Sequence, residues 1–557
     1  MTDEFRRFIR QRQYAWTHNQ HGKYKIMRNK VNRLSKQLRQ HFCSKQVHDM
    51  RRCNARNWWR HTKQLTGQSG RPELTTLANT YTDENMEKLA DLINRSLQAV
   101  TADFVPLSTT DSASTTIEDQ SIDDQYFIQP YQVYNKLSRI DIHKSVGPDN
   151  IPNWVLRDFA FALSDPICHI FNASVQSATV PEIWKKAFVV PIPKVNPPTS
   201  IDTDLRPISL TATLSKILES FVGGWMLEKV SHKFDSFQYG ALAGRSTTHE
   251  LVHLLHVCHQ AVDNHQSVRA VFVDFSKAFD RVDHALVLKK MSHMGVQPFI
   301  TDWMHSFLLH RKQCVKLGKV TSTWVTLNGG MPQGTWFGPY VFLIHINDLK
   351  TAQTTFKFVD DVTVVEFLNS TQSSEMQSAV EVIANWSALN HMQINTAKTK
   401  AMYIKPASRL SQLMPTLSAN NCPIEEVTSF KLLGVILSDD LRWKPHVDHT
   451  IAKASKRLHF LKLLKRSGMS PDDLLYYYKA VIRSVIEYAC PAWQSSLSAY
   501  DMHRLESIQK RAIRVIFGSN DYEFYCVTCG LELLQTRLNN LSQTFFQERG
   551  VNSLRPM

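Results

Sequence analysis

The most informative stretch of this chain is FKFVDDVTVVEF, residues 356–367. Runs rich in β-branched and aromatic residues stand on both sides of the adjacent carboxylates Asp360 and Asp361. Such runs predict two antiparallel strands with the acidic pair at their tight connection. Neighbouring carboxylates repel each other, so a cation is needed to stabilise them, and no basic residue stands beside the pair. Hard oxygen ligands suit magnesium. For a lone acidic pair, a solvated surface turn remains the alternative.

The composition indicates a globular, multidomain protein with unevenly distributed charge. The chain has 557 residues, of which 43% are hydrophobic, and its formal net charge is +15. Residues 1–66 contain 17 Lys and Arg against 3 Asp and Glu, which is a net charge of +14. The remaining residues contain 48 basic against 47 acidic side chains. Nearly all of the excess charge therefore belongs to one segment, which indicates a polyanionic partner.

Cysteine usage and hydropathy restrict the class of protein. The nine cysteines are an odd number without regular spacing, and the N-terminus is polar. We expect a reduced, intracellular protein of the nucleus or cytoplasm, without a secretory signal. The absence of a run of 18 or more apolar residues excludes a membrane-spanning helix. The histidines and cysteine within 253–259 and the lone CxxC at 526–529 match no zinc spacing, so ordinary structural roles are favoured.

The N-terminal third is predicted to contain an arm and a linker. Residues 1–66 combine basic residues with periodic apolar and aromatic ones, which is typical of helices. We interpret this segment as a basic helical arm that binds nucleic acid through phosphate contacts and aromatic stacking. A solvated pair of basic helices is the alternative. Residues 67–130, which include a Ser/Thr/Asp-rich stretch, are interpreted as a linker region.

A second acidic position follows a predicted buried strand. Residues 270–275, AVFVDF, are apolar except for Asp274. An unpaired carboxylate at the end of a buried strand is costly, and strand ends are where α/β proteins place their sites. Capping of the following helix is the alternative role. Just upstream, Thr247 and Glu250 form a capping-box pattern that predicts the start of a helix.

A glycine-rich loop, TLNGGMPQGTWFG, occupies residues 326–338. Its glycines allow close backbone approach, and Gln333 is its one long polar side chain. Because no P-loop lysine follows, this is not the phosphate cradle of a nucleotide hydrolase. Three carboxylates near such a loop are the minimum for a two-metal site, in which ions roughly 3.5–4 Å apart activate a hydroxyl and stabilise a leaving phosphate.

Ordered motifs then reveal a family resemblance. VFVDFSKAFDRVDH, GMPQGTWFGPYVFLIHINDL, FVDD, NTAKTK and FKLLGVIL occur in the order and spacing of a reverse transcriptase. KSVGPDNIP, PEIWKKAFVVPIPK, LRPISLTATLSKILE and QYGALAGRST resemble specifically the reverse transcriptases of non-LTR (LINE-type) retrotransposons. The resemblance covers residues 131 to about 518.

The resemblance implies an α+β, right-hand polymerase fold with a basic helical N-terminal arm. It places the fingers at 131–250, the palm at 251–405, and the thumb with a C-terminal helical region at 406–557. Small departures from the family pattern are Phe358 and Val359 before the acidic pair, where Tyr and Ala are commoner, and Thr335, where Ser is usual. Val359 adds bulk near the expected primer end.

The resemblance also implies roles for individual residues. Asp274, Asp360 and Asp361 match the catalytic ligands of two Mg²⁺ ions, and the carbonyl of Phe275 is a further metal ligand. Other matches are Phe279 as steric gate, Gln333 beside the bound nucleotide, Lys194 and Arg206 on the triphosphate, Lys398 as a catalytic general acid to pyrophosphate, and Leu433 and Gly434 as primer grip.

The implied activity is RNA-directed DNA polymerisation, a nucleotidyl transfer. The implied partners are template RNA, primer DNA and deoxynucleoside triphosphates. No endonuclease precedes the basic arm in this sequence and no RNase H carboxylate set follows the thumb, so we expect an endonuclease supplied in trans. Two alternatives stay open: an inactive or truncated element-derived nucleic-acid-binding protein, and an RNA-dependent RNA polymerase. Phe279 and the finger motifs argue against the second.

Overall fold

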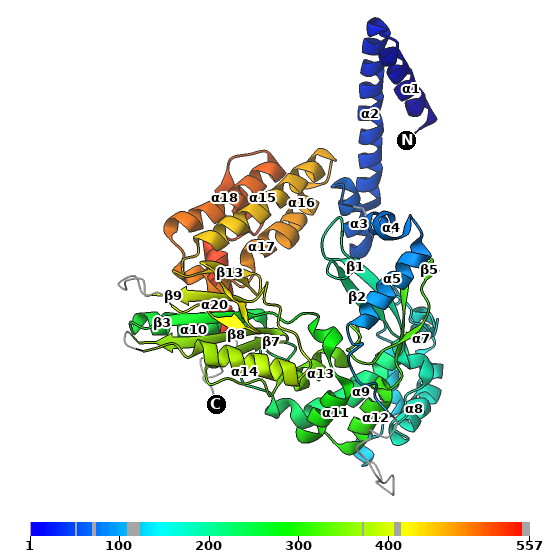
Figure 1. Ribbon diagram of the computed structural model, residues 1–557. Helices are drawn as coiled ribbons and strands as arrows, with labels where there is room; N and C mark the ends of the chain where they lie inside the picture. The colour runs from blue at the N-terminus through cyan, green and yellow to red at the C-terminus, as the bar shows by residue number, and fades with distance from the viewer. Residues whose placement is uncertain are drawn as a thin grey trace. The chain divides into compact units, whose positions relative to one another are not determined.

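A computed structural model describes residues 2–50, 53–68, 74–108, 123–369, 372–405 and 414–547. The chain divides into two compact units (Figure 1). One unit combines Met1–Arg71 with Val435–Leu437 and Arg442–Ser553, and the other consists mainly of Pro72–Gly434. No helix within these described ranges is long and apolar enough to cross a membrane.

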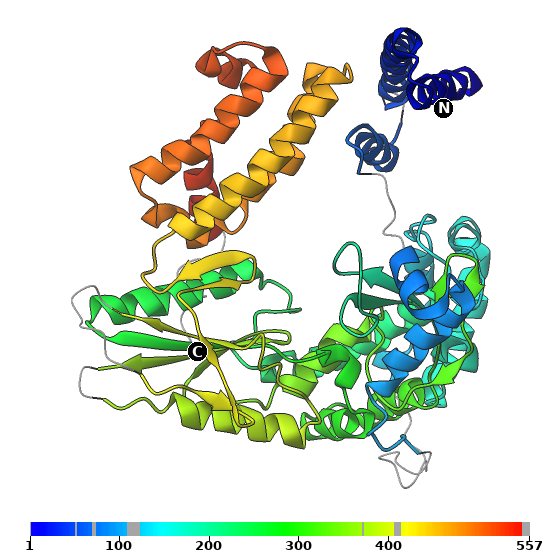
Figure 2. The ribbon, with the colours of Figure 1, turned by 45° about the horizontal axis from the view of Figure 1, so that its top comes forward.

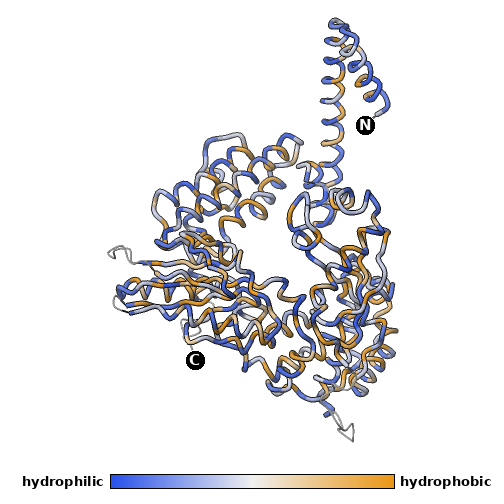
Figure 3. The backbone as a smooth tube through the Cα atoms, in the orientation of Figure 1, coloured by the Kyte–Doolittle hydropathy of each residue, from blue (hydrophilic) through white to orange (hydrophobic). Residues whose placement is uncertain are grey.

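The second unit contains a five-stranded sheet whose strand order is β12-β9-β3-β8-β7. Every residue of the central strand β3 is buried, as expected for a strand with neighbours on both edges. β3 pairs antiparallel with β8 and β9, and β7 pairs antiparallel with β8. Hydrophobic stretches run through these strands (Figure 3). The strands are β3 (Ser267–Val273), β7 (Thr354–Phe358), β8 (Asp361–Leu368), β9 (Lys400–Ile404) and β12 (Glu425–Glu426).

The predicted acidic hairpin is confirmed. Phe358 pairs with Asp361, which leaves Val359 and Asp360 as the two residues of the turn between β7 and β8. The β-branched residues on either side are buried in the sheet, and this burial explains why the pattern predicts strands. The strand predicted at 270–275 also exists, but it begins at Ser267 and ends at Val273.

Helices cover both faces of this sheet. Figure 2 shows α10 (Thr247–Asp263) on one face and α14 (Met376–Leu389) on the other. The apolar residues of α14 join a core that includes Val271 and Val364. The capping box predicted for α10 is wrong by one residue, because the N-cap is Ser246 and Glu250 lies a position too deep in the helix to reach back.

A second sheet has the strand order β2-β1-β4-β5, with β6 paired to β4. β1 and β2 form an antiparallel hairpin, and β1 is parallel to β4. Within the predicted linker region, residues 75–99 form α4 and α5, whose apolar residues pack against this sheet, whereas residues 109–122 lie outside the described residues. The elements are α4 (Thr75–Thr82), α5 (Met86–Ala99), β1 (Lys186–Pro193), β2 (Leu205–Leu210), β4 (Lys312–Leu317), β5 (Val320–Thr321) and β6 (Val325–Thr326).

Further helices and three short strands complete the second unit. Each of the seven helices named below contributes buried residues to the largest apolar core, and α13 follows the glycine-rich loop. The elements are α6 (Pro130–Leu137), α7 (Asn153–Asp158), α8 (Ala160–Gln176), α9 (Thr213–Val230), α11 (His284–His293), α12 (Pro298–Leu308), α13 (Phe337–Ile346), β10 (Ser418–Ala419), β11 (Cys422–Pro423) and β13 (Ser429–Leu432).

The first unit contains helices from both ends of the sequence. Trp58 on α3 donates a hydrogen bond from Nε1 to Asp473 Oδ1, 3.2 Å away, and its ring meets that of Tyr476 edge-on at 5.1 Å. N-terminal helices therefore pack directly on helices that are more than 400 residues later in the chain. The elements are α1 (Asp3–Thr17), α2 (His21–Met50), α3 (Ala55–Leu65), β14 (Val435–Ser438), α15 (Lys444–Arg466), α16 (Pro471–Tyr477), α17 (Ser484–Glu487), α18 (Ala499–Phe517), α19 (Tyr522–Thr528) and α20 (Leu534–Gln547).

Candidate active site

Three carboxylates meet at one end of the central sheet. Val273 pairs with Val362, so Asp274, which follows β3, and Asp361, which opens β8, lie at the same end of adjacent strands. Asp360 occupies the hairpin turn beside them. The structure therefore brings together the three acidic residues that the sequence singles out, although Asp274 lies more than 80 positions before the other two in the chain.

The charges of these carboxylates oppose one another. Loss of hydration is the main cause that raises the pKa of Asp360, and the charge of Asp274 raises it further while Arg206 opposes the shift. Loss of hydration, followed by the charges of Asp360 and Asp274, raises the pKa of Asp361 to about 6. Protein cations near the site thus leave much of its negative charge uncompensated, which is the condition that favours a bound metal ion.

The donor set fits magnesium better than a metal with a closed ligand cage. The three carboxylates supply hard oxygen ligands, and Mg²⁺ typically uses one or two protein carboxylates and keeps several waters. Across the described ranges, no three or more His, Cys, Asp or Glu side chains form a preassembled metal cage. An open site completed by water and substrate phosphates agrees with both observations.

The backbone after β3 pairs with a different segment from the strand itself. Ser276 N donates to Gln393 O at 2.8 Å, and Asn395 N donates to Asp274 O at 2.8 Å. Neither bond uses the carbonyl of Phe275, the predicted additional metal ligand, whose side chain is buried. This change of partner explains why β3 ends at Val273 and why Asp274 leaves the sheet.

Basic side chains approach the acidic end of the sheet. Lys398 lies in the turn before β9, with its Nζ 3.7 Å from Asp274 Oδ2. Lys194 follows β1, and Arg206 pairs with Ile192 in the β1–β2 hairpin. Burial lowers the pKa of Lys194 first, and the charges of Lys398 and Arg206 lower it further. These three predicted residues therefore share one electrostatic neighbourhood, which also includes Lys277.

The glycine-rich loop is held beside this neighbourhood by specific bonds. Gln333 donates from Nε2 to Asp280 Oδ1 at 3.2 Å, and its carbonyl accepts from Ser209 N at 2.8 Å. Gly334 has φ +137°, and a Cβ there would lie 2.5 Å from the carbonyl oxygen of Ser209. Only glycine fits this approach. Sequence reasoning assigned no role to Asp280, although its place six residues after Asp274 was a visible signal.

Phe279 belongs to the helical turn after β3, and its ring packs against α13, the helix that follows the glycine-rich loop. It is half-buried and stacks on Phe342 of α13, with centroids 4.9 Å apart and an interplanar angle of 26°. Phe279 O accepts a hydrogen bond from Met331 N at 2.8 Å. The loop and the turn after β3 are thereby joined, and the ring has a fixed support.

A cavity of about 470 Å³ opens beside the carboxylates. Asp274, Asp361 and Lys398 contribute to its lining. Phe272 and Phe430, which also line it, stack with centroids 4.1 Å apart at an angle of 7°. The predicted primer-grip residues Leu433 and Gly434 follow directly after Leu432, which lines the same cavity, and both have positive φ.

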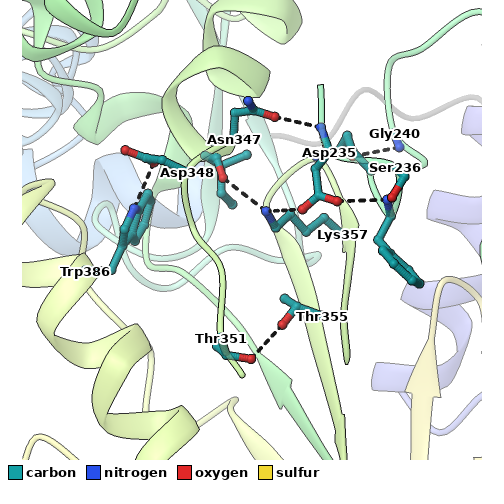
Figure 4. Close-up of polar contacts among 12 residues, drawn as sticks. Asp235, Ser236, Gly240, Asn347, Asp348, Thr351, Thr355, Lys357 and Trp386 are labelled. Atoms are coloured by element: carbon teal, nitrogen blue, oxygen red, sulfur yellow. Dashed lines mark hydrogen bonds and ion pairs between the residues drawn. The ribbon is translucent and has the colours of Figure 1, made fainter. Parts of the chain in front are cut away.

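A buried ion pair anchors β7 just before the hairpin turn (Figure 4). Lys357 Nζ lies 2.8 Å from Asp235 Oδ2, and the Lys357 side chain is fully buried. Asp235 N donates to Asn347 Oδ1 at 2.8 Å. Burial lowers the pKa of Lys357, while Asp235 opposes this shift. Sequence analysis missed this pair because a lysine in an apolar strand gives no sign of its partner.

Comparisons with known proteins show which family the sequence around this site resembles. Residues 192–437 match the family described as reverse transcriptase (RNA-dependent DNA polymerase). This part of the chain is therefore similar to reverse transcriptases. The matched range includes all predicted site residues from Lys194 to Gly434.

Curated relatives of the chain come from transposons and other mobile elements. The chain is 24% identical over 408 residues to a probable RNA-directed DNA polymerase from transposon BS of Drosophila melanogaster, covering 70% of this chain and 44% of that protein. It is 25% identical over 403 residues to the corresponding protein of the X-element of the same species, with the same coverages. It is 24% identical over 447 residues to the RNA-directed DNA polymerase from mobile element jockey, covering 76% and 48%.

The resemblance to non-LTR retrotransposon reverse transcriptases is thus confirmed. The chain spans about half the length of the curated relatives that it matches.

Proposed function

We propose that this chain copies RNA into DNA by two-metal nucleotidyl transfer. The observation that carries the proposal is the meeting of Asp274, Asp360 and Asp361 at one end of the central sheet, beside an open cavity. Their mutual repulsion favours a bound cation, and their chemistry fits Mg²⁺. The similarity of residues 192–437 to a polymerase family makes nucleotidyl transfer the reaction to test first.

The acidic residues would hold two Mg²⁺ ions, with the Phe275 carbonyl as a further ligand. The metal, when bound, supplies positive charge that activates the primer hydroxyl and stabilises the leaving phosphate. The turn between β7 and β8 fixes Asp360 and Asp361 relative to each other, and the end of β3 fixes Asp274. The chain itself thereby provides rigid orientation, which reduces the reorganisation needed during the reaction.

The basic residues would bind the polyphosphate of the incoming nucleotide. Lys194 and Arg206 project from the β1–β2 hairpin, and Lys194 interacts electrostatically with Lys277 and Lys398. Such a group of cations complements a triphosphate. The proximity of Lys398 to Asp274 supports a role in which its Nζ donates a proton to the departing pyrophosphate.

The remaining site residues would select and align the nucleotide and primer. Gln333 would lie beside the bound nucleotide, with its amide oriented by Asp280. Phe279 would limit space at the 2′ position of the sugar, and Leu433 with Gly434 would hold the primer end.

We assign the parts of a right-hand polymerase accordingly. Fingers are proposed at residues 131–250, the palm at 251–405, and the thumb with the C-terminal helical region at 406–557. Residues 1–66 would be a basic arm that contacts template RNA or primer DNA, and 67–130 the connecting region. An endonuclease acting in trans would supply the nick that provides a primer.

Primer extension tests this proposal. The purified chain should extend a DNA primer on an RNA template with deoxynucleotides and Mg²⁺, and Asp274→Asn, Asp360→Asn and Asp361→Asn should each abolish extension. Loss of one ligand removes transition-state stabilisation worth several kcal/mol, so rates should fall by at least about 10³-fold. Asp263→Asn, an exposed position at the end of α10, is the matched control.

Two results would contradict the proposal. Near wild-type extension by any of the three site variants would remove that residue from the reaction. Tight binding of RNA and DNA by a wild-type chain that never extends a primer would instead support a non-catalytic nucleic-acid-binding protein. Circular dichroism of each variant separates loss of chemistry from loss of folding.

A further inference from the structure

The acidic hairpin is in contact with a segment that lies more than 100 residues upstream. Lys357 N on β7 donates to Phe237 O at 3.0 Å, and Tyr239 N donates to Lys357 O at 2.8 Å. Residues 237–239 thus pair in parallel with the edge of β7, immediately before the turn. None of the site residues predicted from the sequence lies in this segment.

The turn itself contains a backbone conformation that its sequence does not favour. Val359 has φ +59°, in the left-handed region. A β-branched residue rarely adopts this conformation, because its side chain crowds the backbone. Such outliers persist only where the surrounding structure imposes them, and they are found preferentially at active sites. Because Val359 directly precedes Asp360, its conformation fixes the direction of both acidic side chains.

Gln238 is placed to impose that conformation. Its side chain is 2% exposed, and its Oε1 accepts hydrogen bonds from Val359 N at 3.0 Å and from Gly240 N at 2.8 Å. One buried oxygen therefore bonds both to the strained turn and to the backbone two residues after Gln238. Arg245 supports the arrangement, since its guanidinium donates to the carbonyl of Gln238 at 2.5 Å.

Gly240 completes the fit against the turn. A Cβ at this position would lie 2.5 Å from Val359 Cγ2 and 2.6 Å from Val359 N. Real Cβ atoms do not approach other atoms so closely, so a larger residue would displace the turn. The Gln238–Gly240 pair thus contacts the Val359 peptide from one side with both a hydrogen bond and a steric limit.

We propose that Gln238 is a positioning residue for the metal-binding carboxylates, acting by holding Val359 in the left-handed conformation. The inference rests on the proposed polymerase function and deepens it, because it names the contact that sets the geometry of Asp360 and Asp361. Gln238 touches neither substrate nor metal in this role. Its acceptor oxygen orients the peptide between Phe358 and Val359, and that peptide orients the acidic pair.

The central test removes the acceptor and then removes the need for it. Gln238→Met keeps a side chain of similar length without the hydrogen-bond acceptor. Val359→Gly allows positive φ without the steric cost of a β-branched side chain. We expect Gln238→Met to lower kcat by about tenfold or more, with the KM for deoxynucleotide within about twofold of wild type. The Gln238→Met/Val359→Gly double variant should regain most of the rate of Val359→Gly alone.

A second measurement does not depend on turnover. Mg²⁺ should raise the melting temperature of the wild-type protein. Gln238→Met should require a higher Mg²⁺ concentration for the same shift, because the acidic side chains are no longer held in the geometry that binds the ion. Gln260→Met, an exposed position on α10, is the matched control and should behave as wild type in both assays. Adding Val359→Gly should restore the Mg²⁺ response.

The steric half of the contact gives an independent test if Gln238→Met fails to fold. Gly240→Ala should reproduce the loss of kcat, and Val359→Ala should restore it only in part, because removing Cγ2 leaves the 2.6 Å approach of the new Cβ to Val359 N. The proposal is overturned if the rescuing substitutions leave kcat and Mg²⁺ response unchanged, which would make Gln238 a packing residue. It is also overturned if the KM for deoxynucleotide rises while kcat is kept, which would place Gln238 on the substrate.

Failure of the polymerase proposal remains distinguishable from failure of this one. A wild-type chain that binds Mg²⁺ without extending primers still supports the positioning role if Gln238→Met weakens the Mg²⁺-dependent shift. A wild-type chain with neither extension nor a Mg²⁺ response overturns both. An active wild-type enzyme with an equally active Gln238→Met variant overturns the positioning role alone.

Discussion

Phe279 illustrates how one side chain can serve packing and selectivity together. Its ring stacks on Phe342 and is half-buried, so one face is supported while the other edge remains open. The residue lies five positions after Asp274, so a metal-bound triphosphate would bring its sugar over the ring. A rigid aromatic there leaves space for a 2′-hydrogen and clashes with a 2′-hydroxyl.

Phe279→Ala should therefore reduce discrimination between nucleotide types. We expect the ratio of kcat/KM for deoxynucleotides over ribonucleotides to fall by at least about tenfold, which corresponds to about 1.4 kcal/mol. Single-nucleotide incorporation with matched dNTP and rNTP measures this ratio. If Phe279 only packs on Phe342, both activities will fall alike and the ratio will stay constant.

Glu250 is a buried carboxyl group whose ionisation the fold disfavours. It is fully buried on α10, and neither carboxylate oxygen has a hydrogen-bond partner among the described residues. Burial raises its pKa well above the usual range, and the charge of Asp361 raises it further. Because the folded-state pKa exceeds the unfolded one, the stability that Glu250 contributes is full below its unfolded pKa and is lost as pH rises through the folded value.

Glu250→Gln should accordingly stabilise the protein in a pH-dependent way. In metal-free buffer, the free energy of unfolding of the variant should exceed that of wild type near pH 7, and the difference should shrink toward pH 4. Denaturant titrations at several pH values measure it. A difference that does not change with pH would show that ionisation of Glu250 plays no part.

The sequence identified residues whose chemistry is visible locally and missed those that act through distant contacts. Asp274, Asp360 and Asp361 could be found because a carboxylate interrupts an otherwise apolar strand pattern. Gln238 could not be assigned, because its hydrogen bond to Val359 joins positions 121 apart. Glu250 was predicted as a helix cap, since spacing alone does not show that the N-cap is one residue earlier.

At the scale of elements, burial decided which predictions succeeded. The strands around the acidic pair were predictable because short runs of β-branched and aromatic residues are typical of buried strands. Strand ends were less predictable, since β3 ends where its neighbour changes. Polar residues inside strands were also missed, because Lys357 is stabilised by Asp235 from another part of the chain.

The Lys357–Asp235 ion pair should be a major stabilising contact for β7. Its lysine side chain is fully buried and its carboxylate is 12% exposed. Lys357→Met leaves Asp235 without a cation, and breaking such a pair typically costs about 3–5 kcal/mol. We expect the free energy of unfolding to fall by about this amount in denaturant titrations.

The double variant Lys357→Met/Asp235→Asn should recover much of that loss, because it removes the uncompensated charge. Lys400→Met, which breaks the ion pair with the exposed Glu425, is the comparison. It should lower the free energy of unfolding far less. Equal losses for the two lysine variants would show that burial of the Lys357 pair has no special effect.

At the scale of the whole molecule, charge is concentrated in one part of one unit. α2 carries four exposed basic side chains within residues 23–30. Replacing them by Gln should weaken binding of nucleic acid and flatten its salt dependence by up to about 3 units of the log–log slope for a single strand. The four positions are Lys23, Lys25, Arg28 and Lys30.

Filter-binding titrations across salt concentration measure this slope. Deletion of residues 1–66 should flatten it further, but that deletion also removes the contact of Trp58 with Asp473. Replacing the three lysines by Arg keeps the charge and should preserve the slope. An unchanged slope in the Gln variant would mean that α2 serves folding or another partner.

The bond between Trp58 and Asp473 has a consequence for synthesis. The two residues are separated by 415 positions, and ribosomes add about 5–20 residues per second. Trp58 therefore leaves the ribosome roughly 20–80 s before its partner is made. Throughout that interval the nascent chain presents an unpartnered aromatic surface on a cationic segment. Messenger length, translation speed and chaperone supply then help determine how many chains mature, and a premature stop codon would leave this surface exposed for good.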